Sequence, residues 1–323
     1  MAGIDKPTPT RAAAPTRQVV AIGAANMDIA GATHNTLLAG DSSPGRIRCA
    51  PGGVARNVAE NLARLGCAVQ LLCAVGDDLF GRSVLAATRS AGVAVDHCWV
   101  LGDQGTSTYL SLHGPDGEMH AAVNDMAILD AVTPQRLAQH ADLVCASQAL
   151  VLDCNLPSAT LDWLFANAPG ATVFVDPVSV AKAVRLRPWL HRVHTLKANR
   201  HEAQLLSDQL VDDDAAVVDA GAWFHAQGVQ QLVLSLGDRG LYWSHRGGPS
   251  GWQAALPVEV ESATGAGDAL LAGLVQQHLA GEPLARAARF AAGCAALTLA
   301  VPGANNPRLS PESVEQLMAA HAN

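Results

Sequence analysis

The chain has 323 residues, of which 49% are hydrophobic and only 15% are charged. This composition is typical of a globular protein that buries a large core in one domain or two. The formal net charge of -8 argues against a general nucleic-acid-binding protein, because such a protein needs a basic face to neutralise phosphates. We therefore expect any nucleotide ligand to be held locally.

The seven cysteines include no C-x-x-C pair, so the sequence predicts neither a zinc site nor a disulfide framework. Reduced thiols fit a cytoplasmic protein. Residues 1–17 are rich in Pro, Thr and Ala and lack the apolar segment of a signal peptide, so we interpret them as a disordered tail. Later apolar runs are short enough to be buried helices, and we expect no membrane association.

From residue 18 to residue 323, short apolar segments alternate with amphipathic ones. This rhythm predicts one α/β domain with a doubly wound, mainly parallel sheet flanked by helices. The predicted strands are 18–23, 69–75, 142–146, 172–175, 194–196 and 231–236. The predicted helices are 83–90, 157–168, 179–191, 199–208, 213–227, 268–280 and 284–300, with others starting at 54 and 311.

Between residues 93 and 126 the alternation gives way to extended segments at 98–101, 106–112 and 119–124, separated by turn signals. A further strand is expected within 29–50. A small sheet inserted over a cleft would act as a lid, formed from about 29–50 and 96–126. The alternative is an edge hairpin without a function.

A glycine-rich stretch, Gly265, Ala266 and Gly267, runs directly into an apolar helix. The first amides of a helix have no intrahelical partner and can bind an anion together with the helix dipole. Asp268 is then placed inside that anion site, where it could accept a hydroxyl proton. Alternatively, the glycines allow close packing and Asp268 complements the dipole, and both interpretations remain open here.

A second helix also begins directly after glycines, with Gly52 and Gly53 before the helix and the polar residue Asn57 one turn into it. Asn26 and Asp28 follow the first buried strand. Polar groups beyond the carboxyl ends of parallel strands lie where α/β sheets bind ligands, so these side chains could grip sugar hydroxyls. The alternatives are a closely packed helix start and an Asx turn that closes the strand.

Three later strand ends also carry polar groups, at Asp153 with Asn155, at Asp176, and at Asn199 with Glu202. Asn199 and Glu202 are three residues apart and share a helix face, where they could order a metal ion or its waters beside phosphates. A solvated helix face is the alternative explanation of this pair.

Taken together and in this order, these features resemble the ribokinase-like (PfkB) family of carbohydrate and nucleoside kinases, over essentially residues 18–320. Several segments are similar to those of a nucleoside kinase in the family, among them AANMDIAG, PGGVARN, VNDM, HTLKANRHEA and GANNPRLS. The resemblance implies ATP with Mg2+ as the phosphoryl source. It also implies a homodimer formed through the lid.

The resemblance further implies roles for individual residues. Asp268 becomes the catalytic base, and the amides of Gly265, Ala266 and Gly267 become the anion hole. The positions implied for the substrate are Asn26, Asp28, Gly52, Gly53, Asn57, Asn155 and Lys182. Those implied for the nucleotide are Asn199, Ser235, Gly237, Thr264 and Asn306. Glu202, together with Asn199, would serve Mg2+ through water.

Two departures from the family pattern matter. Ribokinase itself has a lysine where this chain has Val54, which argues against free ribose as the substrate. Ser262 and Ala263 replace the Asp-Thr of many members, so a potassium or other monovalent-cation site built on those side chains is left open.

A nucleoside kinase must also recognise the base. We expect Thr108, Asn124 and Asp125 of the lid meander to face it, unless they only join the lid strands. The sequence thus predicts an ATP-dependent kinase that phosphorylates a nucleoside hydroxyl. Another sugar or nucleoside kinase of the family is the alternative, and a non-catalytic binding regulator is a second one that the intact Asp268 and glycine loop argue against.

Overall fold

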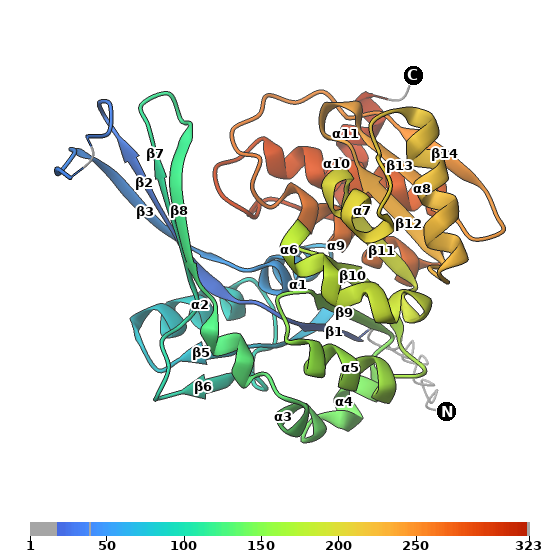
Figure 1. Ribbon diagram of the computed structural model, residues 1–323, viewed down its shortest axis with the longest axis horizontal. Coiled ribbons are helices and arrows are strands. Elements are labelled where there is room, and N and C mark those ends of the chain that lie inside the picture. Colours follow the sequence, from blue (N-terminus) through green and yellow to red (C-terminus); the bar gives the residue numbers. More distant parts are fainter. Residues whose placement is uncertain (1–17, 39, 322–323) are drawn as a thin grey trace, which may run out of the picture.

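The computed structural model describes residues 18–38 and 40–321, so the predicted tail at 1–17 lies outside the described residues. An eight-stranded sheet forms the centre, in the order β14-β13-β12-β11-β10-β9-β1-β4. The strands from β12 to β4 run parallel, whereas β13 and β14 form an antiparallel edge (Figure 1). This confirms the predicted mainly parallel sheet. The strands are β1 Gln18–Ile22, β4 Ala68–Leu72, β9 Ala149–Asp153, β10 Thr172–Asp176, β11 Thr195–Asn199, β12 Gln231–Ser235, β13 Leu241–His245 and β14 Ser250–Gln253.

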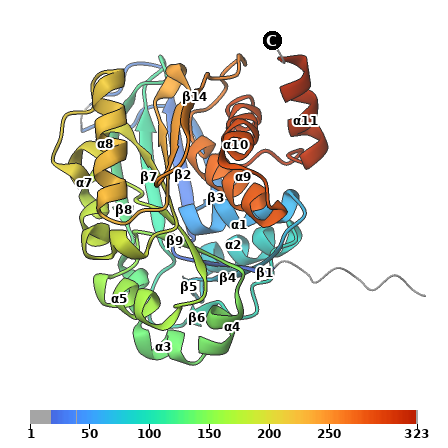
Figure 2. The same ribbon diagram turned by 90° about the vertical axis from the view of Figure 1, so that its right-hand side faces the viewer.

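The central strands are mostly apolar because helices cover both faces of the sheet. In β1, Val20 and Ile22 pack into the core on one face, and Val19 and Ala21 pack into the core on the other. Figure 2 shows the two helical layers on either side of the sheet. One layer contains α1 Val54–Arg64, α9 Ala266–Ala280, α10 Leu284–Leu299 and α11 Pro311–Ala320, and the other contains α5 Ser158–Asn167, α7 Arg200–Ser207 and α8 Asp214–Ala226.

The remaining helices complete the domain. These are α2 Leu79–Ser90, α3 Pro134–Ala138, α4 Ala141–Ala146, α6 Val180–Ala183, and the 3-10 helices η1 Ala127–Ala131, η2 Val184–Arg192 and η3 Gly237–Arg239. Within the described part of the chain, none of the helices combines the length and the apolar character needed to cross a lipid bilayer.

A separate four-stranded sheet, in the order β3-β2-β7-β8, projects from the domain at the left of Figure 1. Strand β2 pairs with β3 antiparallel and with β7 parallel, and β7 pairs with β8 antiparallel. One of its faces carries Ile47, Leu110 and Val123, all of them exposed. The strands are β2 Asn26–Thr33, β3 Gly45–Gly52, β7 Thr108–His113 and β8 Met119–Asp125.

The prediction of a strand at 142–146 is wrong, because this segment lies in helix α4 and the strand lies at 149–153. Both segments are short apolar runs, and periodicity cannot separate a buried strand from a buried helix turn at that length. The predicted lid range also needs correction. Its first segment forms β6 Trp99–Leu101, which pairs with β5 Ala74–Gly76, and the 29–50 region supplies two strands where one was expected.

Candidate active site

Helix α9 begins at a turn that requires glycine at its N-cap. Gly265 is its N-cap with φ 81°, and a Cβ there would collide with the carbonyl oxygen of Ala304. A Cβ on Gly267 would lie 2.6 Å from Nζ of Lys197. The close-packing interpretation is therefore correct. It does not exclude the anion site, which stays a prediction, because the N–H groups of Ala266 and Gly267 are the first of the helix.

Asp268 lies in the first turn of α9 and is only 8% exposed, so it is not a solvated first-turn residue. Its Oδ2 accepts a hydrogen bond of 2.7 Å from Nδ2 of Asn57 on α1. Burial, and next the negative charge of Asp176, raise the pKa of Asp268 to about 7, although Lys197, Asn57 and Arg56 oppose the rise. A carboxylate with this pKa is suited to accept a proton near neutral pH.

A buried ion pair lies beside this carboxylate. Nζ of Lys197, on β11, is 2.8 Å from Oδ2 of Asp176, at the end of β10. Asp176 Oδ1 accepts from the backbone N–H of Val178, whose φ of 70° is unusual for a β-branched residue. The pKa of Lys197 is raised because Asp176 and Glu202 outweigh its burial, so the ammonium group stays charged under the glycine turn.

Sequence reasoning noted Asp176 as a strand-end group without a role, and it missed Lys197. The signal was present in the run Thr-Leu-Lys-Ala-Asn at 195–199. A lysine in an apolar strand of a doubly covered sheet must be paired with a buried acid.

The predicted metal pair, Asn199 and Glu202, forms a capping box at the start of α7. Glu202 is 2% exposed, which rules out a solvated helix face. Burial, and then the charge of Asp176, raise the pKa of Glu202. The charge of Lys197 opposes this rise, so Asp176 and Glu202 both interact with the same ammonium group.

Within 18–38 and 40–321, no group of three or more His, Cys, Asp and Glu side chains is arranged to hold a metal ion alone. Mg2+ in proteins is commonly held by one or two carboxylates together with substrate phosphates and water. Glu202, with Asn199 beside it, fits such a partial site.

Among the predicted sugar-binding residues, the structure brings Asn26 and Asp28 together on β2, where Nδ2 of Asn26 donates to Oδ1 of Asp28 at 2.6 Å. The Asx-turn alternative is wrong because both residues are part of the strand. Burial raises the pKa of Asp28. Gly52 has no side chain and so leaves room for this carboxylate. Gly53 has a φ of 98°, and a Cβ at this position would collide with the carbonyl of Ala24.

Asp153 is fully buried and joins three segments around the site. It accepts from the backbone N–H groups of Ala24 at 2.9 Å, Ala55 at 3.0 Å and Asn155 at 2.9 Å. It thereby fixes the end of β9 against the start of α1. Beside it, the half-buried Lys182 donates to Oδ1 of Asn155, which places these two predicted substrate residues in contact.

A cavity of about 350 Å³ brings together three of the predicted nucleotide residues, Asn199, Ser235 and Gly237. It is also lined by Arg200 and His201, which sequence reasoning did not select. The cavity lies at the carboxyl ends of β11 and β12, so its position agrees with the strand-end rule.

The other two predicted nucleotide residues lie elsewhere. Thr264 is exposed, and its backbone N–H donates to Oγ of Ser262 at 3.2 Å. Asn306 is buried and uses both ends of its side chain within its own region, donating to the Leu297 carbonyl at 2.6 Å and accepting from Arg308 N–H at 2.9 Å. Its contacts therefore give no support to a nucleotide-binding side chain.

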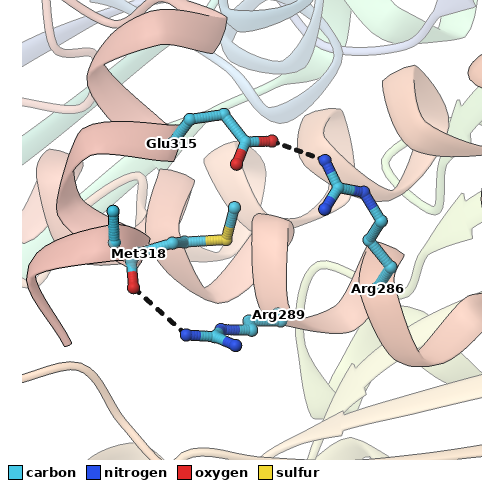
Figure 3. A pocket seen from close by; sticks show the side chains of 5 residues that line it. Arg286, Arg289, Glu315 and Met318 are labelled. Atoms are coloured by element: carbon cyan, nitrogen blue, oxygen red, sulfur yellow. Dashed lines mark hydrogen bonds and ion pairs between the residues drawn. The ribbon is translucent and has the colours of Figure 1, made fainter. Parts of the chain in front are cut away.

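A second cavity, of about 220 Å³, lies between α10 and α11 (Figure 3). Arg286 there is 2.8 Å from Glu315, and Arg289 donates to the backbone carbonyl of Met318 at 3.1 Å. Because both guanidinium groups have protein partners, we assign no ligand to this cavity.

The small sheet does not present the three predicted base-facing residues on one face. Asp28 pairs with Tyr109, which pairs with Asn124, whereas Thr108 pairs with Asp125. Neighbouring residues of a strand point to opposite faces. Asn124 therefore shares a face with Asp28 and Tyr109, whereas Thr108 and Asp125 lie on the opposite face, so the sheet cannot present all three predicted residues to a base on one side.

The buried carboxylate at a helix start, the separate polar pair and the cavity at the strand ends agree with a phosphotransferase that has an alcohol group as acceptor. The chain matches the pfkB family carbohydrate kinase model over residues 16–311, and it belongs to this family.

Three relatives illustrate the similarity. The chain is 46% identical over 300 residues to the pseudouridine kinase of Escherichia coli (strain K12), covering 93% of this chain and 96% of that one. It is similar to the structure of a carbohydrate kinase from Agrobacterium tumefaciens, with TM-score 0.83, 28% identity and coverage of 94% and 97%. Arabidopsis thaliana ribokinase complexed with ribose and ATP shares the fold, with TM-score 0.84, 22% identity and coverage of 94% and 98%.

Proposed function

We propose that this protein transfers the γ-phosphoryl group of ATP to the 5′-hydroxyl of pseudouridine, giving pseudouridine 5′-phosphate and ADP. The observation that carries the reaction type is the Asp268 carboxylate, buried in the first turn of α9 and hydrogen-bonded to Asn57. The 46% identity to a pseudouridine kinase, over nearly the whole of both chains, supports the choice of substrate.

In the proposed reaction, Asp268 accepts the proton of the 5′-hydroxyl while that oxygen attacks the γ-phosphorus in line. The new P–O bond forms as the bond from the γ-phosphorus to the bridging oxygen breaks, and ADP leaves with the electron pair. The N–H groups of Gly265, Ala266 and Gly267 stabilise the phosphoryl oxygens, and the ammonium group of Lys197 adds positive charge below them.

ATP is proposed to bind in the cavity beside Asn199, Ser235 and Gly237, with its phosphates directed to the start of α9. Mg2+ would neutralise phosphate charge there. Glu202, with Asn199, would hold the ion through water.

The nucleoside is proposed to bind between the glycine-led start of α1 and the small sheet. Asn26, Asp28 and Asn57 would contact its sugar, together with Asn155, just beyond β9, and Lys182 of α6. The small sheet would then act as a lid that excludes water from the transfer.

The opposite, apolar face of this sheet offers a surface for a second copy of the chain. Ile47, Leu110 and Val123 on it are 77%, 40% and 66% exposed. Such a patch is costly to leave in water, and we propose that it forms a homodimer in the cytoplasm.

Measuring ADP release with a panel of nucleosides and sugars tests the proposal. We expect kcat/KM to fall in the order pseudouridine, uridine, free ribose. Ribose, fructose or adenosine as the best acceptor would overturn the substrate but keep the kinase. Calorimetric binding of nucleoside and ATP without ADP release would instead identify a binding regulator.

A further inference from the structure

Arg56 has the largest of the fully buried side chains in the described part of the chain, and it is 1% exposed. Each part of its guanidinium group has a partner. Nε donates to the Gly52 carbonyl at 3.0 Å, Nη1 donates to Glu60 at 2.6 Å, and Nη2 donates to the side-chain oxygens of Asn57 and Asn305. A buried arginine fork of this kind fixes the groups around it, because each loses a strong hydrogen bond if it moves.

The contact with Asn57 determines which end of that amide faces Asp268. A side-chain amide has one acceptor end and one donor end. Since Oδ1 of Asn57 accepts from Arg56, its Nδ2 is left to donate to Oδ2 of Asp268 at 2.7 Å. A turned amide would present Oδ1 to Asp268, and an oxygen acceptor can pair only with the protonated carboxyl group.

Asn305 supports the same arrangement from the C-terminal loop. Its Nδ2 donates to the backbone carbonyl of Asn57 at 3.0 Å, while its Oδ1 accepts from Arg56. The preceding residue, Ala304, is the one whose carbonyl packs against Gly265. Arg56 thus ties the first turn of α1 to the loop that supports the first turn of α9.

We propose that Arg56 is a positioning residue for phosphoryl transfer, which acts through Asn57 to hold the Asp268 carboxylate ionised and correctly oriented. This inference rests on the proposed function. Among the side chains that Arg56 contacts in the described residues, Asn57 is the one that bonds to the Asp268 carboxylate, so we assign the effect on orientation to Asn57.

The charges around Asp268 agree with this role. Asp176, from β10, raises the pKa of Asp268, whereas Lys197 from β11 and Arg56 from α1 lower it. Arg56 also lowers the pKa of Asp28 on the sugar side. Without Arg56, the carboxyl group would lose both a cation and a fixed hydrogen-bond donor.

A double-mutant cycle tests the proposal with Arg56→Met, Asn57→Ala and the double variant. We expect Arg56→Met to lower kcat by about 10- to 100-fold with little change in KM. This loss is smaller than that of the whole general base, because the carboxylate itself remains. The acid limb of its kcat profile should move to higher pH by about one unit. If Arg56 acts through Asn57, the same change in the Asn57→Ala background should lower kcat by less than about threefold.

Arg64→Met is the matched control. Arg64 binds the same Glu60, at 2.7 Å, and the same C-terminal loop, through the Pro307 carbonyl at 2.8 Å, but in the described residues it has no bond to Asn57. We expect kcat and the acid limb of this control to stay at wild-type values. Independent, multiplicative effects in the cycle, or a control that reproduces the shift, would overturn the proposal.

Arg56→Met should fold, because Arg64 still neutralises Glu60. If it does not, the cycle is run with Arg56→Lys, which keeps a cation but cannot donate as a fork to Asn57 and Glu60 together. A full wild-type kcat in Arg56→Lys would overturn the positioning role. A kcat that Arg56→Lys lowers when Asn57 is present, but not in the Asn57→Ala variant, would support it.

A measurement without turnover separates this inference from the proposed substrate. Carboxyl 13C NMR titration of the ligand-free protein, with the Asp268 signal assigned from Asp268→Asn, follows the ionisation directly. We expect the Asp268 signal to titrate at higher pH in Arg56→Met than in wild type or Arg64→Met. An unchanged titration would contradict the inference even if pseudouridine is the substrate, and a shifted one would support it even if another nucleoside is.

Discussion

Nδ2 of Asn57 donates to Oδ2 of Asp268 across 2.7 Å, between residues that are 211 positions apart in the sequence. This bond joins the first turns of α1 and α9, the two helices that begin at glycines. Each glycine removes a side chain that would block the approach of the other elements. The glycines therefore allow close packing at both helix starts, and the contact orients a carboxylate in the first turn of α9.

Replacing Asp268 by asparagine tests the base directly. The amide has the same shape and can still pair with Asn57, so we expect the fold and the KM values to persist. Without a proton acceptor, kcat should fall by a factor on the order of 10²–10⁴. Steady-state kinetics with ATP and pseudouridine measure this, and turnover within threefold of wild type would remove Asp268 from the mechanism.

The same carboxylate should control the pH dependence of kcat/KM. The base must be ionised, so the rate should fall below the pKa of about 7. Because Asp176 raises that pKa and Lys197 lowers it, Asp176→Asn should move the acid limb to lower pH and Lys197→Met should move it to higher pH. Rate profiles from pH 5 to 9 decide this, and shifts of both variants in one direction would contradict the assignment.

Stability should vary with pH in the opposite sense to activity. The pKa of Asp268 is raised in the folded protein from 3.8 to about 7, so the unfolded chain releases this proton first as the pH rises. Folding stability therefore falls from about pH 4 to pH 7, by up to a few kcal/mol. We expect Asp268→Asn to raise Tm at pH 8 and to lose this advantage near pH 4. Thermal melts of the ligand-free proteins measure it, and an equal effect at both pH values would show that ionisation of Asp268 costs nothing.

The sequence predicted the sheet because its buried strands are continuous apolar runs. It predicted Asp268 and Asn57 because glycines and polar residues meet at helix starts. The error at 142–146 arose because the segment before β9 is as apolar as the strand itself. In the same way, sequence patterns did not show that Lys197 pairs with Asp176 or that Arg56 braces Asn57, because those bonds join elements whose contact depends on the fold.

The lid error has a different physical cause. Thr108 and Asn124 both belong to the lid meander, but the side chains of a strand alternate between faces. Only the register of β2, β7 and β8 shows that Tyr109, and not Thr108, shares a face with Asp28 and Asn124.

The corrected register gives a prediction about the base. Pseudouridine offers a ring N–H where uridine has C–H, and an acceptor aimed at that group can discriminate by factors of up to roughly 10⁴. We expect Asn124→Ala to reduce the preference for pseudouridine over uridine. Thr108→Val, on the opposite face, is the control and should keep it. The ratio of kcat/KM values is the measurement, and equal effects of the two variants would place base recognition elsewhere.

Glu202→Gln tests the metal site. Glutamine can still accept from the Asn199 N–H, so the capping box and the fold should persist. We expect a higher Mg2+ concentration for half-maximal rate and an unchanged KM for the nucleoside. Asp213→Asn, at the N-cap of α8, is the control, because its carboxylate bonds only to the Ala216 N–H in the described residues. Magnesium titrations that coincide for the two variants would leave Glu202 with a structural role alone.

The central claim is that this protein phosphorylates the 5′-hydroxyl of pseudouridine. The most direct measurement is 31P NMR of the mixture of wild-type protein, ATP, Mg2+ and pseudouridine, with proton coupling retained. We expect a new phosphomonoester signal coupled to the two C5′ protons, growing in step with ADP. A mixture that forms no phosphomonoester, or one whose signal couples to a ring proton of the sugar, would contradict it.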